Sequence, residues 1–342
     1  MAKKPPKRST KKTNKKKSTR SRKTVKVVMI GAGNRARGAH YPSLRDMKDV
    51  KMVGVCDLDE VRMKQVAEEY DIPGQYTNYV EMIEKEKPDV VYAIMPPHHI
   101  FDLSVNVMER GVNLVIEKPP SVTSEQARQM ALLAKKNKVI TGVTFQRRFA
   151  PVIRRGKEIC EKNGPIHSAS SYFYKNEVGG KALYNGAMEK LMCDGIHAVD
   201  TLRYLCGGEV EAVASDVRRL DATFRNMHTA LVRFSSGATG VVSNCYMMGR
   251  RMFTVEVHSA GMSMFGDPEE GGQVYADGKV EPVQELDPWT LAKSQEQHVA
   301  FGAYGINRHF IDCIKSGKET ETNFEDSAKS MELVDAIFAS QI

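Results

Sequence analysis

The residues best suited to chemistry are a lysine in the first half of the chain and a histidine in the second. Lys118 stands in Glu117-Lys118-Pro119-Pro120, directly after the apolar, mostly β-branched run 112–116. That run predicts a buried strand, and open α/β sheets bind ligands at the carboxyl ends of their strands. Because the prolines stiffen this backbone, the pattern predicts an ammonium group aimed at a ligand crevice. The alternative is a surface lysine before a proline.

The histidine lies in a helix predicted over 193–206, which Gly207 ends. Asp194 and Asp200 are each three residues from His197 and therefore neighbour it on the helix surface. A carboxylate beside an imidazole fixes its tautomer and raises its basicity, which suits proton abstraction from an alcohol near neutral pH. The alternative is a helix-surface histidine with ordinary local pairing.

A glycine-rich turn supplies a nucleotide site for the lysine to face. The predicted strand 25–30 runs into GAGNRA over residues 31–36, which is G-x-G-x-x-A, the small-residue form of the dinucleotide fingerprint. Gly31 permits the tight turn, Gly33 lets the backbone approach a pyrophosphate, and Ala36 permits close helix–strand packing. The start of the following helix offers N–H donors to the phosphates.

An acid follows the second predicted strand, 51–56, at the position where ribose is bound in such folds. Asp57 lies 24 residues beyond Gly33, and its carboxylate can accept hydrogen bonds from ribose hydroxyls and repel a 2′-phosphate. This predicts NAD as cofactor, with NADP less favoured. The alternative is a helix cap, but Asp59 suits the cap of the predicted helix 60–69 better.

Further predicted strands alternate with helices through the first half of the chain, which implies a parallel sheet covered on both faces. These elements are helix 79–86, strand 89–94, helix 99–110, strand 112–117, helix 124–136 and strand 138–144. The sequence MPPHH over 95–99 opens a loop over the crevice. Its adjacent histidines point in different directions and no nearby acid completes a ligand set, so we expect no metal site.

The second half is rich in predicted strands, which suggest a mostly antiparallel sheet: 166–174, 209–218, 227–234, 238–247, 252–259 and 273–283. Turn signals stand at 235–237 and at Asp277-Gly278. The fold class is therefore α/β. We expect a Rossmann domain over 25–145 and a second α/β domain over 146–342, whose last helix packs back on the first.

Composition and charge narrow the class of protein. The chain of 342 residues is 41% hydrophobic and 27% charged, typical of globular proteins, and contains no membrane-spanning run or export signal. Scattered cysteines without a Cys-x-x-Cys pair favour reduced thiols in the cytoplasm. The six are Cys56, Cys160, Cys193, Cys206, Cys245 and Cys313.

The net charge of +8 comes from one segment. Residues 1–24 hold twelve Lys or Arg and no acid, and removing them leaves 38 basic against 42 acidic residues. With almost no apolar side chain this segment is expected to be disordered. It is a solvated extension, an arm that contacts a polyanion (nucleic acid, an acidic membrane or an acidic partner), or a targeting segment. Without aromatic residues any nucleic-acid contact would be dominated by phosphates.

Read in order, the motifs resemble the Gfo/Idh/MocA family of oxidoreductases. They are the fingerprint, E-K-P after the fifth strand, Q-R-R-F-x-P after the sixth, and D-G-I-H-x-x-D; the resemblance runs from residue 25 to a late helix at 309–314. It implies an NAD(P)-binding Rossmann domain and a C-terminal domain built on a large open sheet that commonly forms a homodimer or homotetramer interface. Typical members oxidise a hydroxyl of a sugar, a sugar derivative or an inositol.

Carried over by residue, the resemblance makes Lys118 the family lysine and His197 the catalytic histidine, with Asp194 as its partner acid. The implied cofactor contacts are Gly31, Gly33, Asn34, Arg35, Asp57, Pro96, Glu117, Lys118, Gln146 and Arg147. The chain departs from the family at Met95, where many members have Thr, and at Ile100, where they have His. In inositol-type members the partner acid stands where this chain has Cys193. That leaves open whether Asp194 faces the substrate or only orients the histidine.

Three functions follow from this sequence. The first is an NAD-dependent dehydrogenase that acts on a secondary hydroxyl of a sugar or inositol. The second is an NAD-recycling glycosidase or lyase of the same family, which would release a leaving group without net NADH. The third is a non-catalytic NAD-binding protein tethered to a partner by its basic segment.

Overall fold

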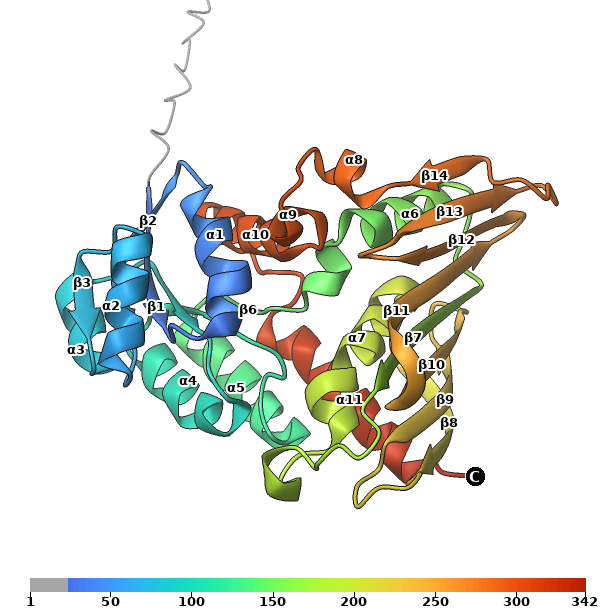
Figure 1. The fold of residues 1–342 in the computed structure, drawn as a ribbon, viewed down its shortest axis with the longest axis horizontal. Coiled ribbons are helices and arrows are strands. Elements are labelled where there is room, and N and C mark those ends of the chain that lie inside the picture. Colours follow the sequence, from blue (N-terminus) through green and yellow to red (C-terminus); the bar gives the residue numbers. More distant parts are fainter. Residues whose placement is uncertain (1–23) are drawn as a thin grey trace, which may run out of the picture.

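The computed structural model describes residues 24–342, and the predictions made for the basic segment lie outside the described residues. Two β-sheets stand side by side, and C-terminal helices lie between them (Figure 1). The two sheets correspond to the two halves of the sequence.

The first sheet has six parallel strands in the order β3-β2-β1-β4-β5-β6. This is the Rossmann order, in which the winding reverses between β1 and β4 and ligands bind beyond the carboxyl ends of the strands. The prediction of a doubly wound parallel sheet is confirmed. Its strands are β1 (Val25–Ile30), β2 (Val50–Cys56), β3 (Gly74–Tyr76), β4 (Val90–Ala93), β5 (Asn113–Ile116) and β6 (Thr141–Val143).

Helices cover both faces of this sheet, and β4 is buried at every residue. The predicted helices 60–69 and 79–86 are confirmed to the residue. The other two begin or end within one residue of their predicted bounds. The helices are α1 (Tyr41–Arg45), α2 (Glu60–Glu69), α3 (Tyr79–Glu86), α4 (Ile100–Glu109) and α5 (Ser124–Asn137).

The second sheet has eight strands in the order β14-β13-β12-β11-β7-β10-β9-β8, antiparallel except for the pair β10 and β7. The predicted strand 273–283 is confirmed only up to residue 276, because the chain turns at Asp277 and Gly278, where a turn was predicted and both residues have positive φ. β12 was not predicted. The strands are β7 (Ser168–Asn176), β8 (Val210–Arg218), β9 (Met227–Phe234), β10 (Thr239–Cys245), β11 (Met247–Ser259), β12 (Met262–Asp267), β13 (Gly271–Ala276) and β14 (Gln284–Leu286).

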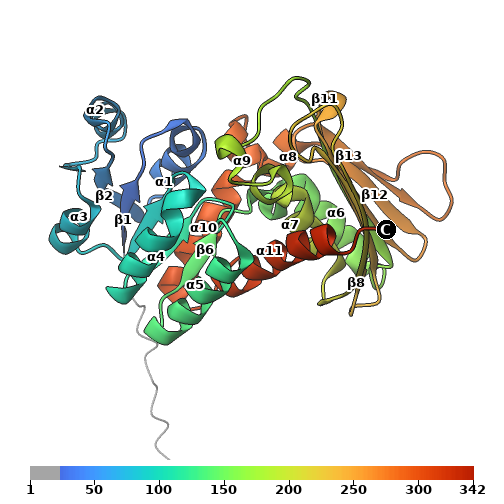
Figure 2. The same ribbon diagram turned by 90° about the horizontal axis from the view of Figure 1, so that it is seen from below.

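Helices pack on one face of this second sheet and leave the other face open (Figure 2). The predicted helix 193–206 is present, but its first turn, Leu191–Gly195, is a wider π-helical turn. No helix within residues 24–342 is both long and apolar enough to cross a membrane. The helices of this half are α6 (Pro151–Lys162), α7 (Ile196–Cys206), α8 (Pro288–Ala292), α9 (Gln297–Ala300), α10 (Ala303–Ser316) and α11 (Phe324–Ala339).

The C-terminal helices return to the first domain. Ile306, Phe310 and Ile311 of α10 join the hydrophobic core around β1. Gly142 in β6 makes room for this packing, because a Cβ atom there would lie 2.5 Å from the Phe310 ring. α11 packs along α5 at the same time. These contacts fix the two sheets relative to each other.

Candidate active site

The fingerprint turn after β1 is shaped for a dinucleotide. Gly31 has φ +104°, and a Cβ atom there would lie 2.1 Å from the Ile94 carbonyl oxygen, so only glycine fits. A Cβ atom on Gly33 would meet nothing within 4 Å, which leaves open space beside the start of the following helix. A pyrophosphate fits this combination of close backbone and free space.

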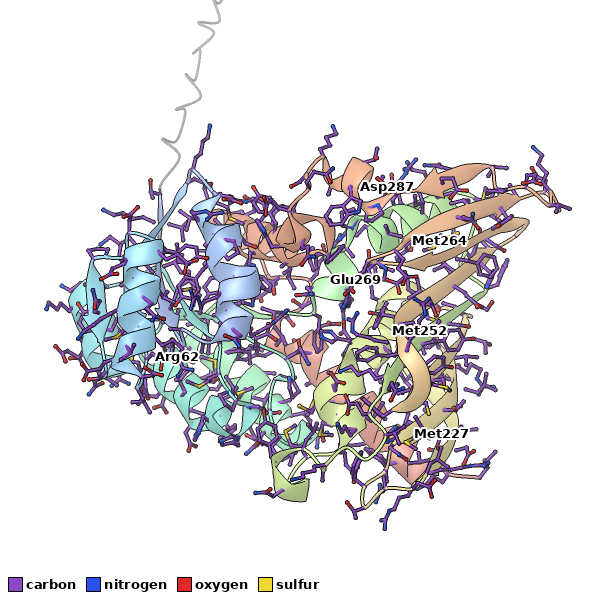
Figure 3. The ribbon with its side chains drawn as sticks, in the orientation of Figure 1. Arg62, Met227, Met252, Met264, Glu269 and Asp287 are labelled. Atoms are coloured by element: carbon purple, nitrogen blue, oxygen red, sulfur yellow. The ribbon has the colours of Figure 1, made fainter. Side chains whose placement is uncertain are left out.

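Asp57 and Asp59 divide two tasks after β2. Asp59 caps α2, because its carboxylate accepts the Arg62 backbone N–H at 3.0 Å. Asp57 faces the fingerprint turn instead, where its Oδ2 accepts the Ala32 N–H at 2.7 Å. The guanidinium of Arg62, a residue of α2 that is labelled in Figure 3, lies 3.3 Å from Asp57 Oδ1. The predicted helix cap is confirmed, and an acid and an arginine meet where the adenine ribose is bound in such folds.

Glu117 is the centre of a buried network. Its Oε1 accepts from Arg35 Nε at 2.6 Å and lies 3.0 Å from His40 Nε2. Asn307 of α10 holds the other ring nitrogen of His40 at 3.2 Å. Burial raises the pKa of Glu117, but Arg35 and His40 outweigh it and hold the pKa well below its usual range. The network ties the fingerprint helix to the end of β5, where the next residue is Lys118.

Lys118 reaches across the crevice to the second domain. Its Nζ donates to the Cys193 carbonyl oxygen at 3.0 Å, and its backbone N–H is bonded to the Glu117 carboxylate at 3.0 Å. The bond between Lys118 and Pro119 is cis. The ammonium group therefore stands beside the π-helical turn that leads into the helix of His197.

His197 lies on the first turn of α7, and its Nδ1 is buried without a hydrogen-bond partner among the described residues. Burial lowers the pKa of the imidazole well below 6.5, and the charges of Lys118, Arg147 and Arg35 lower it further. The imidazole is therefore neutral near pH 7, which leaves a ring nitrogen able to accept a proton. Lys118 of the first domain thus bonds to the turn directly before the helix of His197, and its charge acts on that imidazole.

The expectation that Asp200 orients His197 is wrong. Arg148 holds the Asp200 carboxylate in a bidentate pair at 2.7 and 2.5 Å, and Ser330 donates to it at 2.8 Å. Asp200 and Arg148 are both buried. Residues three positions apart lie on a similar side of a helix but can contact different neighbouring elements. Here the buried Arg148 binds the Asp200 carboxylate in place of His197.

We expect Asp200→Asn to destabilise the fold by about 3 kcal/mol, because the buried Arg148 guanidinium loses its bidentate carboxylate and keeps only Asp326 as counter-charge. Denaturant unfolding followed by circular dichroism measures this loss. Asp216→Asn is the matched control, since its pair with Arg218 lies on the surface and its loss is expected to change little. If Asp200→Asn kept wild-type stability but lost activity, the conclusion that Asp200 does not orient His197 would be contradicted.

Asp194 also pairs away from the histidine. Its Oδ2 lies 2.6 Å from Lys175 Nζ at the end of β7, and no hydrogen bond joins it to His197 within residues 24–342. Lys175 lies 3.6 Å from a second acid, Glu177. The predicted pairing of Asp194 with the imidazole is therefore not made in this structure, and Asp194 pairs with Lys175 of β7.

Gln146 and Arg147 follow β6 and meet both domains. Gln146 Oε1 accepts a hydrogen bond from the Arg35 guanidinium, which links it to the fingerprint. Arg147 is buried, lies over the Phe253 ring at 5.1 Å and donates to Glu269 at 2.6 Å. Figure 3 shows Glu269 between the second sheet and this segment. Sequence reasoning placed Gln146 and Arg147 here but missed Glu269.

The loop after β4 also borders the crevice. Pro96 precedes the short 3-10 turn Pro97–His99, and the rings of His98 and His99 lie 4.0 Å apart. Within residues 24–342 no three His, Cys, Asp or Glu side chains are grouped as a metal site requires. His98 instead contacts an aromatic ring of the second domain.

His40 and Lys175 were missed as well as Glu269. His40 contacts an acid 77 positions further along the chain, and no local pattern signals such a pair. Lys175 ends a strand whose alternation predicts only which face it lies on. A motif search finds residues that sit in fixed local geometry, and these two become part of the site only through the tertiary fold.

Comparison with known proteins agrees with this geometry. The NAD-binding Rossmann domain of the Gfo/Idh/MocA oxidoreductase family matches residues 25–145, and the C-terminal domain of the same family matches residues 160–264. The two matches cover both the fingerprint and the helix that carries the histidine.

Relatives of similar length extend the likeness over most of the chain. D-apiose dehydrogenase of Paraburkholderia graminis is 25% identical, over 94% of this chain and 89% of the relative. The NAD(+) scyllo-inositol 2-dehydrogenase of Bacillus subtilis is 26% identical, over 90% and 92%. Among solved structures, a dehydrogenase from Chromobacterium violaceum has a TM-score of 0.83 at 22% identity, over 93% of this chain and 96% of that one. The chain therefore belongs to the Gfo/Idh/MocA family and is an NAD(P)-dependent dehydrogenase with NAD as its cofactor.

Proposed function

We propose that this dehydrogenase oxidises a secondary hydroxyl of a sugar, a sugar derivative or an inositol. The observation that carries the proposal is the contact of Lys118 with the turn that leads into the helix of His197. The Lys118 ammonium is bonded to the Cys193 carbonyl, four residues before His197, and its charge helps keep the imidazole neutral. A cation and a neutral base side by side are what removal of a hydroxyl proton requires.

In this mechanism Lys118 donates a hydrogen bond to the reacting oxygen and stabilises the negative charge that develops on it. His197 accepts the hydroxyl proton on a free ring nitrogen. NAD, when bound, supplies the acceptor for the hydride from the adjacent carbon. Glu117 holds the backbone of Lys118 in place through its own network with Arg35 and His40.

For Asp194 we propose a role in substrate binding, in place of a pairing with His197. Its pair with Lys175 presents a carboxylate and an ammonium side by side at the substrate side of the crevice. Such a pair can accept from one hydroxyl of a polyol and donate to its neighbour. We assign both residues to substrate binding, with Cys193 in place of the acid found in inositol-type members.

The names of the relatives support a polyol substrate without fixing which one. A screen of scyllo-inositol, myo-inositol, D-apiose, simple glucosides and sugar acids with NAD, followed by NADH absorbance, tests the proposal. We expect NADH to accumulate with at least one polyol. Release of a leaving group from a glycoside without net NADH would contradict net oxidation and favour NAD recycling.

We expect Asp57→Ser to raise the preference for NADPH over NADH by about tenfold or more, because it removes a like charge facing the 2′-phosphate. Arg62 then keeps only its 3.5 Å pair with Asp59 and becomes available to that phosphate. Fluorescence titration with both reduced cofactors measures the ratio without any substrate. Asp59→Ser is the matched control, since serine also caps a helix and this side chain faces α2. If Asp59→Ser changed the preference for NADPH over NADH equally, the assignment of Asp57 to the ribose would be contradicted.

We also propose that the open face of the second sheet joins copies of the chain into a homodimer or homotetramer. Leu231 and Phe265 point from this face and are 53% and 42% exposed. Strand register places them in one row across the sheet, through Val241, Ser170 and Glu256. Leu231, Val241 and Phe265 are the apolar members of this row, beside the polar Ser170 and Glu256, and exposed apolar side chains on an open sheet face mark interfaces. A monomeric mass by light scattering would contradict the proposal.

The cytoplasm is the compartment we propose. All six cysteines are free in the structure, which fits reducing surroundings.

A further inference from the structure

One connection in the second domain has an unusual backbone. Between β7 and the π-helical turn, three consecutive residues have positive φ: Tyr184 at +47°, Asn185 at +56° and Gly186 at +91°. Glycine and asparagine adopt this region readily, but a bulky aromatic residue rarely does. Such a conformation persists only where the surrounding structure holds it, and it is concentrated at functional sites.

The ends of this loop are firmly held. Leu183 and Met188 form an isolated antiparallel bridge, and the Gly186 N–H donates to the Leu183 carbonyl at 2.9 Å. Met188 is buried, and the next anchor, Lys190, is buried in an ion pair with Glu177. The tip of the loop is therefore fixed in direction although its residues are exposed.

That tip points at the first domain. The Tyr184 ring lies edge-on to the His98 ring, with centroids 5.3 Å apart. His98 belongs to the turn after β4, at the carboxyl end of the strands where the cofactor is bound in this fold. Figure 1 shows the yellow-green connection reaching from the second sheet towards the helices of the first domain. The two rings thus meet across the crevice from opposite domains.

The tyrosine also lies near the proposed reaction site. Burial raises the pKa of Tyr184, and the nearby Cys193 thiol raises it further. The carbonyl of the same Cys193 holds the Lys118 ammonium. Yet 42% of Tyr184 remains exposed, so part of the ring is free to contact a ligand. An aromatic ring offers an apolar face and a polar hydroxyl, which together match the C–H face and the hydroxyls of a cyclic polyol.

We propose that Tyr184 is a substrate-binding residue, which packs on the ring of a cyclic polyol held at Lys118 and His197 and closes the crevice over it by its contact with His98. The substrate role rests on the proposed function, and the cover over the crevice does not. The positive backbone angles are the means by which the loop directs the ring inwards. Lys181 and Lys190 on the same connection are not part of this contact, because Lys181 is exposed and Lys190 is paired.

Steady-state kinetics test the substrate role with the polyol that gives the fastest NADH formation in the screen. Tyr184→Ala is expected to raise KM about tenfold or more with kcat within about threefold, because it removes ring contacts but leaves the reacting groups. Tyr184→Phe keeps the ring and separates it from the hydroxyl. Val178→Ala is the matched control, an exposed apolar residue on the same connection. Equal KM values for Tyr184→Ala and Val178→Ala would overturn the substrate role.

Quenching of bound NADH fluorescence by acrylamide tests the cover and needs no substrate. Tyr184→Ala and His98→Ala are expected to raise the quenching constant about twofold or more over wild type, while Val178→Ala leaves it unchanged. Melting curves confirm that the variants fold. If no polyol is oxidised but the quenching changes as stated, the proposed function fails and the cover stands. If all four proteins are quenched equally, the cover is overturned, whatever the screen shows.

Discussion

Lys118→Ala is expected to lower kcat by about 10²- to 10⁴-fold while NADH still binds, because the lysine acts on the reacting oxygen and not on the body of the cofactor. The fingerprint turn, Asp57 and Gln146 are untouched by the change. Turnover is measured with the best polyol of the screen, and cofactor affinity by NADH fluorescence. We expect the dissociation constant to stay within about threefold of wild type, since one contact of many is lost.

Two further variants test whether the loss of turnover is specific to the Lys118 ammonium. Lys136→Ala removes an exposed lysine from α5 and is expected to behave as wild type. Lys118→Arg keeps the charge but replaces a compact ammonium with a planar fork, so it is expected to recover little activity. Wild-type turnover in Lys118→Ala would show that the ammonium serves only to hold the Cys193 carbonyl.

Local sequence signals predicted the parts of the site that are held by local geometry. Gly31 must be glycine because of its own φ and the carbonyl beside it, and the fingerprint shows this directly. The cap of α2 by Asp59 is likewise local. The cap of α5 is of the same local kind, since Thr123 accepts the Gln126 N–H at 3.2 Å and Gln126 accepts the Val122 N–H in return.

The predictions that failed concern side chains whose partners are brought to them by tertiary packing. Helical spacing placed Asp200 beside His197, but Arg148, 52 positions earlier, takes its carboxylate. Asp194 likewise pairs with Lys175, which comes from another element, and not with His197. Spacing along one helix fixes a direction, and the charge that arrives there from another element decides the pair.

Missed elements had weak local signals of a different kind. The strand β12 carries methionine, serine and glycine in place of the β-branched residues that mark strands. The helix α6 contains Gly156, which lowers helix propensity but lets the Met264 side chain pack against the backbone. In both cases packing against a neighbour stabilises an element that its own propensity does not favour.

His197→Asn is expected to lower kcat by about 10²- to 10⁴-fold and to change the pH profile, because it removes the proton acceptor but keeps a polar side chain. His167→Asn, at an exposed position before β7, is the matched control. The residual activity of His197→Asn should increase as pH rises, since hydroxide then replaces the missing base. Wild-type activity with an unchanged profile would remove the histidine from the mechanism.

The direction of the pKa shift fixes where the wild-type profile falls. Burial first, then Lys118, Arg147 and Arg35, lower the pKa of His197 well below 6.5, so the imidazole loses its proton more readily than in the unfolded chain. The acid limb of kcat/KM is therefore expected below pH 6.5. Stability should follow the same sign: below pH 6.5 the unfolded chain binds a proton at this residue that the folded chain does not, so protons favour unfolding.

Lys118 and His197 are coupled through this shift, and the coupling gives the sharpest test of the pair. Removing the Lys118 charge should raise the pKa of His197 towards 6.5, so the acid limb of the residual activity in Lys118→Ala moves to higher pH. A His197 signal followed by NMR titration in the same variant should move in the same direction without any substrate. If neither the acid limb nor the titration moved, burial and the two arginines would set the pKa of His197 without Lys118, and the two residues would not share one site.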